Sequence, residues 1–520
     1  MTTAWPAHWR RRAPALAALA GAVAALGHAP LGLWPLTVLA LAAILALFRG
    51  APTGRAAMAL GWAAGLGYFA LALAWIVEPF FVDIARHGWM APFALLGMAG
   101  GLALFWGAAH GLAWRLAWRS GAGPVPGAVP WAVALACAEL ARSYVLTGFP
   151  WALLGHVLIE APLLPVAAVV GAQGLTLLVL ALGVGVYALL RRRALVALLI
   201  FGSALGLGAY AQLMQSAAIV ARPADSARPV LRLIQPNAAQ HLKWDPAMTG
   251  LFFRRQLRLT AAADPAAPDP TRRPDLVIWP ETAIPVSLNY AQPVIAQVAA
   301  AAQGAPVVMG ILREEGARLY NSAVLIDGQG AVGAIYDKHH LVPFGEYMPL
   351  AGVMTRLGIT GFVTDGGQGF SAGPGARLMP IAGVGQALPL ICYEAVFAQD
   401  VAAAPARPEF LLQITNDAWF GKVSGPYQHL AQARLRAVEQ GLPMVRAANT
   451  GISAIIDIDG TLTASLGLGQ AGFVQGALPA ARPPTIYAQL GDWPIALLYL
   501  VVLALCHIVT NKTRARRRGL

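Results

Sequence analysis

The segment Asp275-Leu-Val-Ile-Trp-Pro-Glu281 is typical of a short buried strand that delivers a carboxylate beside a proline. Two other segments have the same design. Ala334-Ile-Tyr-Asp-Lys338 ends in an ammonium, and Leu388-Pro-Leu-Ile-Cys392 ends in a thiol. Side chains at strand ends are fixed by the scaffold while the adjoining loops stay open, and layered α/β enzymes usually place their reacting groups there. The three strand ends therefore predict an enzyme.

Glu281, Lys338 and Cys392 together suit acyl transfer. The carboxylate takes the thiol proton, the thiolate attacks a carbonyl carbon, and the ammonium stabilises the oxyanion that develops. A nearby ammonium also lowers the pKa of a thiol. Each residue alone has an ordinary reading, because a single cysteine after a strand is usually a core residue. Spacing along the chain does not establish that the three side chains meet.

The three segments lie within residues 217–491, where short β-rich runs alternate with turns and helical stretches. This mixture predicts an α/β or layered α+β domain of catalytic size. The domain holds 20 Lys or Arg and 19 Asp or Glu, so it has no excess of positive charge for a nucleic-acid partner. The predicted strands are Val230–Ile234, Asp275–Trp279, Pro306–Met309, Ala323–Ile326, Gly333–Asp337, Ala387–Ile391, Phe410–Thr415 and Ile452–Ile458, and the predicted helices are Pro293–Ala302 and Pro426–Gln440.

Long apolar runs flank this domain. Of the 520 residues, 58% are hydrophobic and only 12% are charged, against about 25% charged residues in an ordinary soluble domain. The mean hydropathy is +0.60. A transmembrane helix needs about 20 mostly apolar residues, and eight runs qualify: 13–29, 32–48, 56–79, 90–117, 125–145, 161–190, 194–214 and 492–510. The first run also resembles a cleavable signal, but another run follows it almost at once.

The sequence thus predicts a polytopic α-helical membrane protein with eight transmembrane helices. Residues 1–216 form a seven-helix domain, 217–491 the catalytic domain, and 492–520 the eighth helix with a basic tail. Outside 217–491 there are 17 Lys or Arg and 5 Asp or Glu. With the N-terminus inside, all but Arg86 and Arg142 of these basic residues fall in cytoplasmic segments, as the positive-inside rule requires. Both termini are then cytoplasmic, and 217–491 lies outside the cytoplasm.

Glu139 and Arg142 are charged residues within one of the apolar runs. Charges inside a membrane segment are candidates for a functional site. Their spacing of three residues also lets the two side chains neutralise each other on one helix face. Both readings remain open from the sequence.

Four longer segments resemble the nitrilase superfamily and, together with the apolar flanks, the apolipoprotein N-acyltransferase family of the bacterial inner membrane. They are Ile278-Trp-Pro-Glu-Thr-Ala283, Tyr336-Asp-Lys-His-His-Leu-Val-Pro-Phe-Gly-Glu-Tyr-Met-Pro349, Ile391-Cys-Tyr-Glu394 and Thr415-Asn-Asp-Ala-Trp-Phe420. The resemblance covers essentially the whole chain in the same order. It implies a periplasmic nitrilase-like α-β-β-α sandwich carried by membrane helices.

The resemblance also implies roles for individual residues. Glu281 is the expected general base, Cys392 the nucleophile, and Lys338 the group that stabilises the tetrahedral intermediate, with the backbone N–H of Tyr393 as a second donor. Three residues match supporting positions of the family: Glu346, Tyr393 and Glu394.

Five further residues are candidates for substrate contact. Trp244 matches a family tryptophan near the entrance for the acyl chain. Asn416 and Trp419 lie in a segment that is near the active site in the family, although an Asn-Asp pair also suits a simple turn. Met354 and Phe362 belong to a loop rich in Leu, Met, Phe and Gly. We expect that loop to be a mobile lid lying against the bilayer, with a buried loop over the core as the alternative.

The reaction implied by the resemblance is a two-step acyl transfer through a thioester on Cys392. The donor is a phospholipid, typically phosphatidylethanolamine, and the acceptor is the α-amine of a diacylglyceryl-cysteine at an apolipoprotein N-terminus. We expect no metal or other cofactor, because His339 and His340 have no further ligands at a useful spacing. We also expect a monomer in the lipid bilayer.

Two other functions compete with this interpretation. A membrane-tethered amidase or nitrilase would use the same three residues with water as the acceptor. A transporter or receptor would use the outer domain for binding only, but the apolar runs lack the paired broken helices and central charges of a transport path. Eight helices are more than tethering requires, which favours a lipid substrate.

Overall fold

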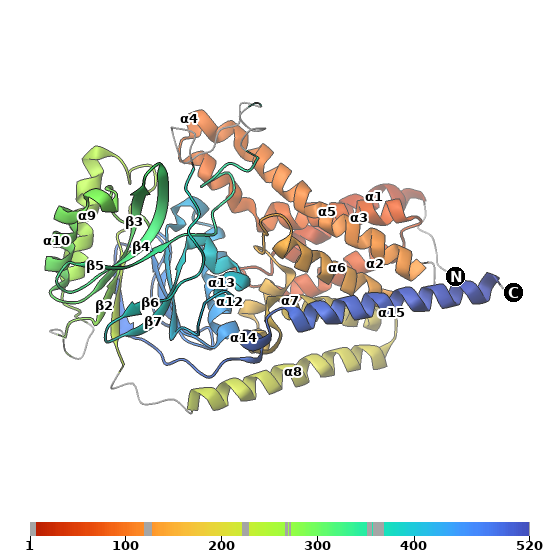
Figure 1. Cartoon of the computed structure of the whole chain (residues 1–520). Helices are drawn as coiled ribbons and strands as arrows, with labels where there is room; N and C mark the ends of the chain where they lie inside the picture. Colours follow the sequence, from red (N-terminus) through yellow and green to blue (C-terminus); the bar gives the residue numbers. More distant parts are fainter. Residues whose placement is uncertain are drawn as a thin grey trace. The chain divides into compact units, whose positions relative to one another are not determined.

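The computed structural model describes residues 7–118, 127–220, 228–265, 269, 272–350, 356 and 369–518 (Figure 1). The chain divides into two compact units. The first comprises Met1–Val220, Val423–Ala431 and Pro484–Leu520, and the second comprises Ala221–Lys422 and Gln432–Pro483.

The first unit is helical, and each of the eight apolar runs overlaps one of its long helices. The long helices are α1 (Ala7–Ala25), α2 (Trp34–Arg49), α3 (Gly54–Ala72), α5 (Ala91–Trp118), α6 (Ala128–Tyr144), α7 (Ala167–Leu190), α8 (Ala194–Val220) and α15 (Trp493–Arg518). The short elements are η1 (Ala74–Phe81), α4 (Ile84–His87), η2 (Gly88–Met90), η3 (Leu154–Glu160), η4 (Leu164–Val166) and α14 (Ile486–Leu490).

Several of these helices have the length and composition of membrane spans. Among the described residues, four stretches are long and apolar enough to cross a bilayer: Ile84–Ala117, Leu164–Leu190, Ala194–Ala217 and Trp493–Lys512. A fifth is possible if Gly54–Ala72 and Ala74–Phe81, which meet at a bend of 48°, form one broken span. The helical unit is therefore compatible with a membrane protein, and the number of eight spans stays a prediction.

Helices α1 and α3 pack at very short range because glycines stand at their contact. A Cβ on Gly21 would collide with the backbone of Ala64, and a Cβ on Gly67 would collide with the backbone of Ala18. In lipid the hydrophobic effect does not hold helices together, so close packing of small residues stabilises the contact between helices instead. The two glycines therefore set the distance between these helices.

Glu139 and Arg142 form a fully buried ion pair on α6, with 2.8 Å between Arg142 Nη2 and Glu139 Oε2. The other Glu139 oxygen accepts a hydrogen bond from the indole of Trp106 on α5, at 2.8 Å. Arg142 also donates to the carbonyl oxygens of Phe149, Trp151 and Ala152. The two charges thus pair with each other on one helix face, which is one of the two interpretations that the sequence left open, and Arg142 also holds the turn after α6.

Replacing Arg142 by Met should lower the free energy of unfolding by about 3–5 kcal/mol, because it leaves the Glu139 carboxylate buried without its counter-ion. Thermal or denaturant unfolding in detergent measures the change. Arg193→Met removes an exposed arginine of the same unit and is the matched control. Equal stability of the two variants would contradict this role for the ion pair.

The second unit contains two six-stranded sheets. The first has the order β12-β1-β2-β3-β4-β5, and the second has the order β11-β10-β9-β8-β7-β6. The strands of the first are β1 (Val230–Gln235), β2 (Leu276–Ile278), β3 (Val307–Glu315), β4 (Arg318–Ile326), β5 (Val332–Asp337) and β12 (Gly472–Ala477). Those of the second are β6 (Met379–Ile381), β7 (Gly385–Ile391), β8 (Phe410–Thr415), β9 (Met444–Ala448), β10 (Ser453–Ile456) and β11 (Leu462–Leu466).

The two sheets contact each other through β1 against β9 and β10 and through β4 against β7. Helices α9 (Pro246–Ala261) and α10 (Gln292–Ala302) pack on each other and against β1 and β3 of the first sheet (Figure 1). The remaining elements are η6 (Leu288–Tyr290), η7 (Cys392–Val396), α12 (Ala398–Ala402), η8 (Asp417–Phe420) and α13 (Gly425–Gln440), of which 425–431 are grouped with the helical unit.

The direction of the strands brings several carboxyl ends to the same edge of each sheet. Strands β1, β2 and β3 are parallel, and β5 runs in the same direction because β3–β4 and β4–β5 are both antiparallel. In the second sheet β7, β8 and β9 are parallel. The loops that follow β2 and β5 therefore leave one edge together, and the loops after β7, β8 and β9 leave the other sheet together.

Candidate active site

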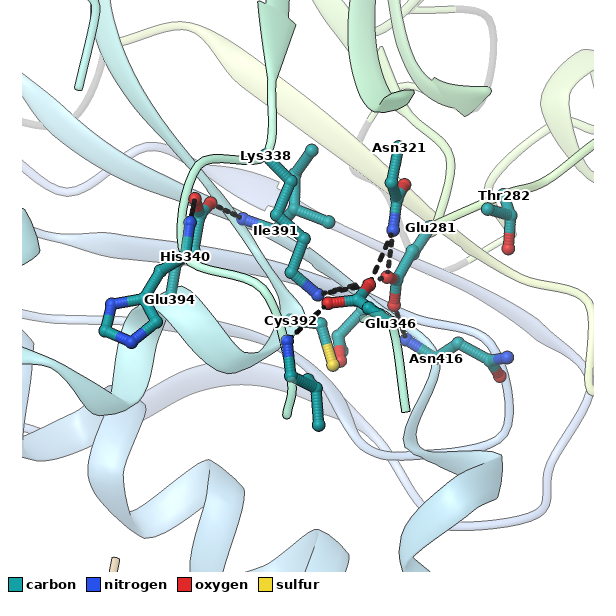
Figure 2. Close-up of polar contacts among 12 residues, drawn as sticks. Glu281, Thr282, Asn321, Lys338, His340, Glu346, Ile391, Cys392, Glu394 and Asn416 are labelled. Atoms are coloured by element: carbon teal, nitrogen blue, oxygen red, sulfur yellow. Dashed lines mark hydrogen bonds and ion pairs between the residues drawn. The ribbon is translucent and has the colours of Figure 1, made fainter. Parts of the chain in front are cut away.

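The three side chains predicted at strand ends lie together (Figure 2). Glu281 follows β2, Lys338 follows β5 directly, and Cys392 follows β7 directly. All three are buried, with exposed fractions of 6%, 1% and 5% respectively. Two come from the first sheet and one from the second, so the site forms only when the two sheets pack on each other.

Both oxygens of the Glu281 carboxylate are held by donors. Oε1 accepts a hydrogen bond from the amide of Asn321 at 2.7 Å, and Oε2 accepts one from the backbone N–H of Asn416 at 2.8 Å. The Lys338 ammonium lies 3.8 Å from Oε1. Strand β3 passes directly beneath, where a Cβ on Gly310 would come within 2.6 Å of the Glu281 backbone. The carboxylate therefore has one fixed orientation.

Lys338 is paired with a second carboxylate. Its Nζ lies 2.8 Å from Oε1 of Glu346, whose other oxygen accepts the backbone N–H of Val342 at 2.8 Å. Burial by itself would lower the pKa of Lys338, but the charges of Glu346 and Glu281 and the neighbouring Cys392 outweigh burial and raise that pKa above its ordinary value. The ammonium is therefore charged throughout the physiological range.

The backbone of Cys392 is in the left-handed region, with φ of +54°. This conformation is uncommon for a residue other than glycine, and it persists only where the surroundings hold it. The carbonyl oxygen of Cys392 accepts a hydrogen bond from the buried side chain of Gln413 at 3.0 Å. Gln413 in turn accepts from Arg446, which is paired with the buried carboxylate of Asp417. A chain of buried polar groups thus fixes the residue that carries the thiol.

The thiol of Cys392 is protonated at neutral pH in this site. Burial raises its pKa above the ordinary value of a thiol, and the nearby Glu281 carboxylate raises it further, while the Lys338 ammonium offsets only part of the increase. A thiol in this state becomes a nucleophile only when a base removes its proton. Among the carboxylates that act on this thiol, Glu281 has the largest effect on its pKa, ahead of Asp417.

Glu394 connects the strand end that carries Lys338 to the strand end that carries Cys392. Its carboxylate is fully buried and accepts the backbone N–H groups of His339, at 2.8 Å, and Ile391, at 2.7 Å. The N–H of His340 and the hydroxyl of Tyr336 also donate to it. Because one carboxylate binds both segments, neither can move independently of the other.

Two histidines extend this connection toward Asp400. His340 Nδ1 lies 2.8 Å from Asp400 Oδ2, and its ring stacks on Phe397. Burial lowers the pKa of His339, but bonds to Asp400 and Glu394 outweigh burial and raise the pKa to about 10. Within the described residues no group of three or more His, Cys, Asp or Glu is placed to hold a metal ion.

The supporting and substrate-contact candidates are distributed unevenly. Glu346 and Asn416 contact the central groups directly, as described above. Tyr393 is buried and packs edge-on against Phe397. Trp244 is 44% exposed and lines a cavity that Glu281 also lines. Trp419 is half-buried in η8. Met354 and Phe362 lie outside the described residues.

Sequence reasoning missed several polar residues around Glu281. Asn321 lies in the middle of β4, and Asn449 follows β9 and bonds the side chain of Asn416. Lys243 is buried and donates to the Glu281 carbonyl oxygen at 3.2 Å. The available sequence signal was a polar residue within or directly after an apolar run, as in Leu319-Tyr-Asn-Ser-Ala323, because such a residue is buried only with a partner.

A small cavity lies beside Glu281. Its walls include Lys243, Trp244, Phe252, Gln256 and Asn449. It therefore combines aromatic surface with a buried ammonium and two amides next to the carboxylate.

Paired six-stranded sheets with Glu, Lys and Cys at their strand ends define a nitrilase-type domain. In agreement, residues 255–483 match the family described as carbon-nitrogen hydrolase, and residues 20–185 match the family described as the apolipoprotein N-acyltransferase N-terminal domain. Among solved structures, an amidase from Nesterenkonia sp. is 20% identical, with a TM-score of 0.36, over 52% of this chain and 97% of the amidase.

Curated relatives match almost the entire chain. The apolipoprotein N-acyltransferase of Bradyrhizobium diazoefficiens is 39% identical over 98% of this chain and 96% of the relative. That of Brucella melitensis is 38% identical over 95% and 94%, and that of Caulobacter vibrioides is 39% identical over 94% and 93%. The chain therefore belongs to the apolipoprotein N-acyltransferase family.

Replacing Glu394 by Gln should lower the free energy of unfolding by about 1–3 kcal/mol, because the amide cannot accept all the buried donors that the carboxylate accepts. Chemical denaturation of the full-length protein measures the loss. Glu315→Gln, which changes a side chain that is 64% exposed, is the control. If both variants unfold like the native protein, Glu394 does not hold the two strand ends together.

Proposed function

We propose that this chain transfers an acyl chain from a phospholipid to the N-terminal amine of a diacylglyceryl-cysteine on an apolipoprotein. The observation that carries the proposal is the buried Cys392 thiol placed beside Glu281 and Lys338 in a chain of this family. Such a thiol reacts with an ester carbonyl when the adjacent carboxylate accepts its proton. The proposed product is the N-acylated, mature lipoprotein.

In the first half-reaction, Glu281 takes the proton of Cys392 as Sγ attacks the carbonyl carbon of the lipid ester. The tetrahedral intermediate carries a negative oxygen, which the Lys338 ammonium and the backbone N–H of Tyr393 stabilise. When the intermediate collapses, the carbon–oxygen bond to glycerol breaks, and the leaving oxygen takes the proton from Glu281. The products are a thioester on Cys392 and a lysophospholipid.

In the second half-reaction, the neutral α-amine of the apolipoprotein attacks the thioester carbonyl. Glu281 accepts the proton that the amine loses and returns it to Sγ as the carbon–sulfur bond breaks. Each half-reaction passes through its own tetrahedral intermediate with a negative oxygen, and the Lys338 ammonium stabilises both. Glu346 keeps that charge in place through its 2.8 Å contact with Nζ. Water must stay away from the thioester, or the acyl chain is hydrolysed instead.

We further propose that the protein spans the bacterial inner membrane eight times. Both termini are then cytoplasmic, and residues 217–491 are periplasmic. The distribution of Lys and Arg supports this orientation. Large apolar side chains exposed along α8 and α15 support contact with lipid, among them Leu195, Leu198, Leu205, Leu213, Leu497 and Leu500. Both proposed substrates carry lipid chains, so a monomer in the bilayer meets them without their release into water.

The expected donor is phosphatidylethanolamine, and intact mass spectrometry tests it. Native protein incubated with this lipid should gain the mass of one fatty-acyl group, and Cys392→Ser should gain none under the same conditions. A diacylated lipopeptide should then remove the group.

The same experiment separates the two competing enzymes. Discharge that is equally fast in water alone would replace the transferase by a membrane-tethered hydrolase. Active, folded protein that shows no increment would mean that the nucleophile or the donor is wrong.

Replacing Glu281 by Gln should separate thiol ionisation from catalysis. Glu281 raises the pKa of Cys392, so its removal should lower that pKa and speed alkylation of the thiol at a given alkaline pH. Acyl transfer should nevertheless fall by about 100-fold or more, because the proton acceptor and donor is gone. Alkylation and acylation rates are measured on the same preparation. Loss of alkylation together with acylation would show a distorted site rather than a missing base.

A further inference from the structure

Lys243 is a buried cation that the reaction proposed above does not use. It lies in the turn between β1 and α9, and its exposed fraction is 7%. Its Nζ donates to the carbonyl oxygen of Glu281 at 3.2 Å and to the hydroxyl of Thr282 at 2.8 Å. The ammonium thus bonds two consecutive residues of the turn that carries the carboxylate.

The turn at Glu281 and Thr282 needs contacts from neighbouring residues to keep its conformation. Thr282 has a φ of +44°, a left-handed conformation that is unfavourable for a β-branched residue. Such conformations cost of order 1–3 kcal/mol and persist only where neighbouring groups fix them. On one side the turn packs against Gly310 of β3. On the other side the Lys243 ammonium bonds it.

The loop that carries Lys243 is itself fixed to the site. The side chain of Asn449 bonds both the N–H and the carbonyl oxygen of Ala238, at 2.9 and 2.8 Å. The side chain of Gln240 accepts a hydrogen bond from Asn416 at 2.7 Å. The N–H of Asn416 donates to the Glu281 carboxylate. These contacts form a closed ring. It runs from the Glu281 carboxylate through Asn416 to the loop that carries Lys243, and from Lys243 back to the Glu281 backbone.

We propose that Lys243 is a positioning residue for Glu281, and that its positive charge and two hydrogen bonds hold the carboxylate in the orientation that takes the Cys392 proton. This inference rests on the base role proposed for Glu281. Lys243 touches neither the thiol nor the reacting carbonyl, so its effect passes through Glu281.

The charge of Lys243 depends on pH in a range that experiments reach. Burial lowers the pKa of Lys243 to about 8, although the Glu281 carboxylate partly offsets the decrease. The groups that face the ammonium are the Glu281 carbonyl and carboxylate, the Thr282 hydroxyl and the Trp244 ring. Below this pKa the ammonium is charged, and above it the neutral amine holds the turn less firmly.

The role of Lys243 is therefore tested by the decrease of the acylation rate on the alkaline side of its pH profile, which we call the alkaline limb. The pKa values of Lys338 and Cys392 are both raised above their ordinary values. Deprotonation of the Lys338 ammonium or of the Cys392 thiol therefore does not change the acylation rate near pH 8. Acyl-enzyme formation without the acceptor avoids titration of the acceptor amine. Full-length protein with phosphatidylethanolamine in mixed micelles is followed by mass across neutral and alkaline pH.

Lys243→Met should slow acyl-enzyme formation by about 10- to 100-fold at neutral pH, because small displacements of a reacting group have effects of this size. The KM for lipid should change little, and the alkaline limb near pH 8 should vanish. Lys243→Arg, which stays charged, should move the limb to higher pH. Arg254→Met removes an exposed cation from α9 and should keep the native rate and profile.

Thr282→Val provides a second route if Lys243→Met does not fold, because it removes one acceptor of the ammonium and keeps the shape of the side chain. It should slow acylation several-fold with the KM unchanged. A native rate and a native alkaline limb in folded Lys243→Met would overturn the role of Lys243 alone. Native protein that forms no acyl-enzyme would overturn the proposed function, and this inference with it.

Discussion

The buried carboxylate of Glu394 is the interaction on which the candidate site depends. Cys392 follows a strand of one sheet and Lys338 follows a strand of the other. Packing of the two sheets alone does not fix the distance between the two side chains, because the sheets could slide slightly or a side chain could rotate. Glu394 accepts donors from both segments, including the N–H groups of His339 and Ile391. A buried acceptor with donors on two elements is costly to break, because each freed N–H would be left without water. The carboxylate therefore acts as a fixed spacer between the ammonium and the thiol.

Charge balance explains how so many ionic groups tolerate burial around one thiol. Lys338 has Glu346 and Glu281 as partners, and Arg446 has Asp417. Truncating one partner of such a pair leaves an uncompensated buried charge and is strongly destabilising. The outcome for Cys392 is a pKa raised mainly by burial. A thiol that stays protonated until a base takes its proton is protected from unwanted alkylation and oxidation, because the thiolate is the reactive form.

The strands that the sequence predicted are short runs made mainly of large apolar and β-branched residues. Phe410–Thr415 was predicted with the bounds of β8, and Ala387–Ile391 and Gly333–Asp337 lie within β7 and β5. Strands β6, β9, β11 and β12 and helix α9 were not singled out. Strand β9 reads Met444-Val-Arg-Ala-Ala448 and has a single β-branched residue and two alanines, so its composition does not favour a strand, and the buried Arg446 adds a charge. Strand β11 is largely exposed, and β12 begins and nearly ends with glycine, so neither shows the alternation that burial on one face produces.

The same physics explains which part of the site was predictable. A charged or nucleophilic residue directly after an apolar strand stands out in the sequence, and this is how Glu281, Lys338 and Cys392 were found. Asn321 and Asn449 are polar residues within or directly after apolar runs, which predicts that they are buried with partners, but the sequence does not show which distant groups they and Lys243 bind. Asn449 is 211 residues from the Ala238 backbone that it bonds. When a side chain acts by binding backbone atoms, the sequence does not identify its partner, because those backbone atoms are the same in every amino acid. The groups that react can therefore be predicted from side-chain type, whereas the groups that aim them require the fold.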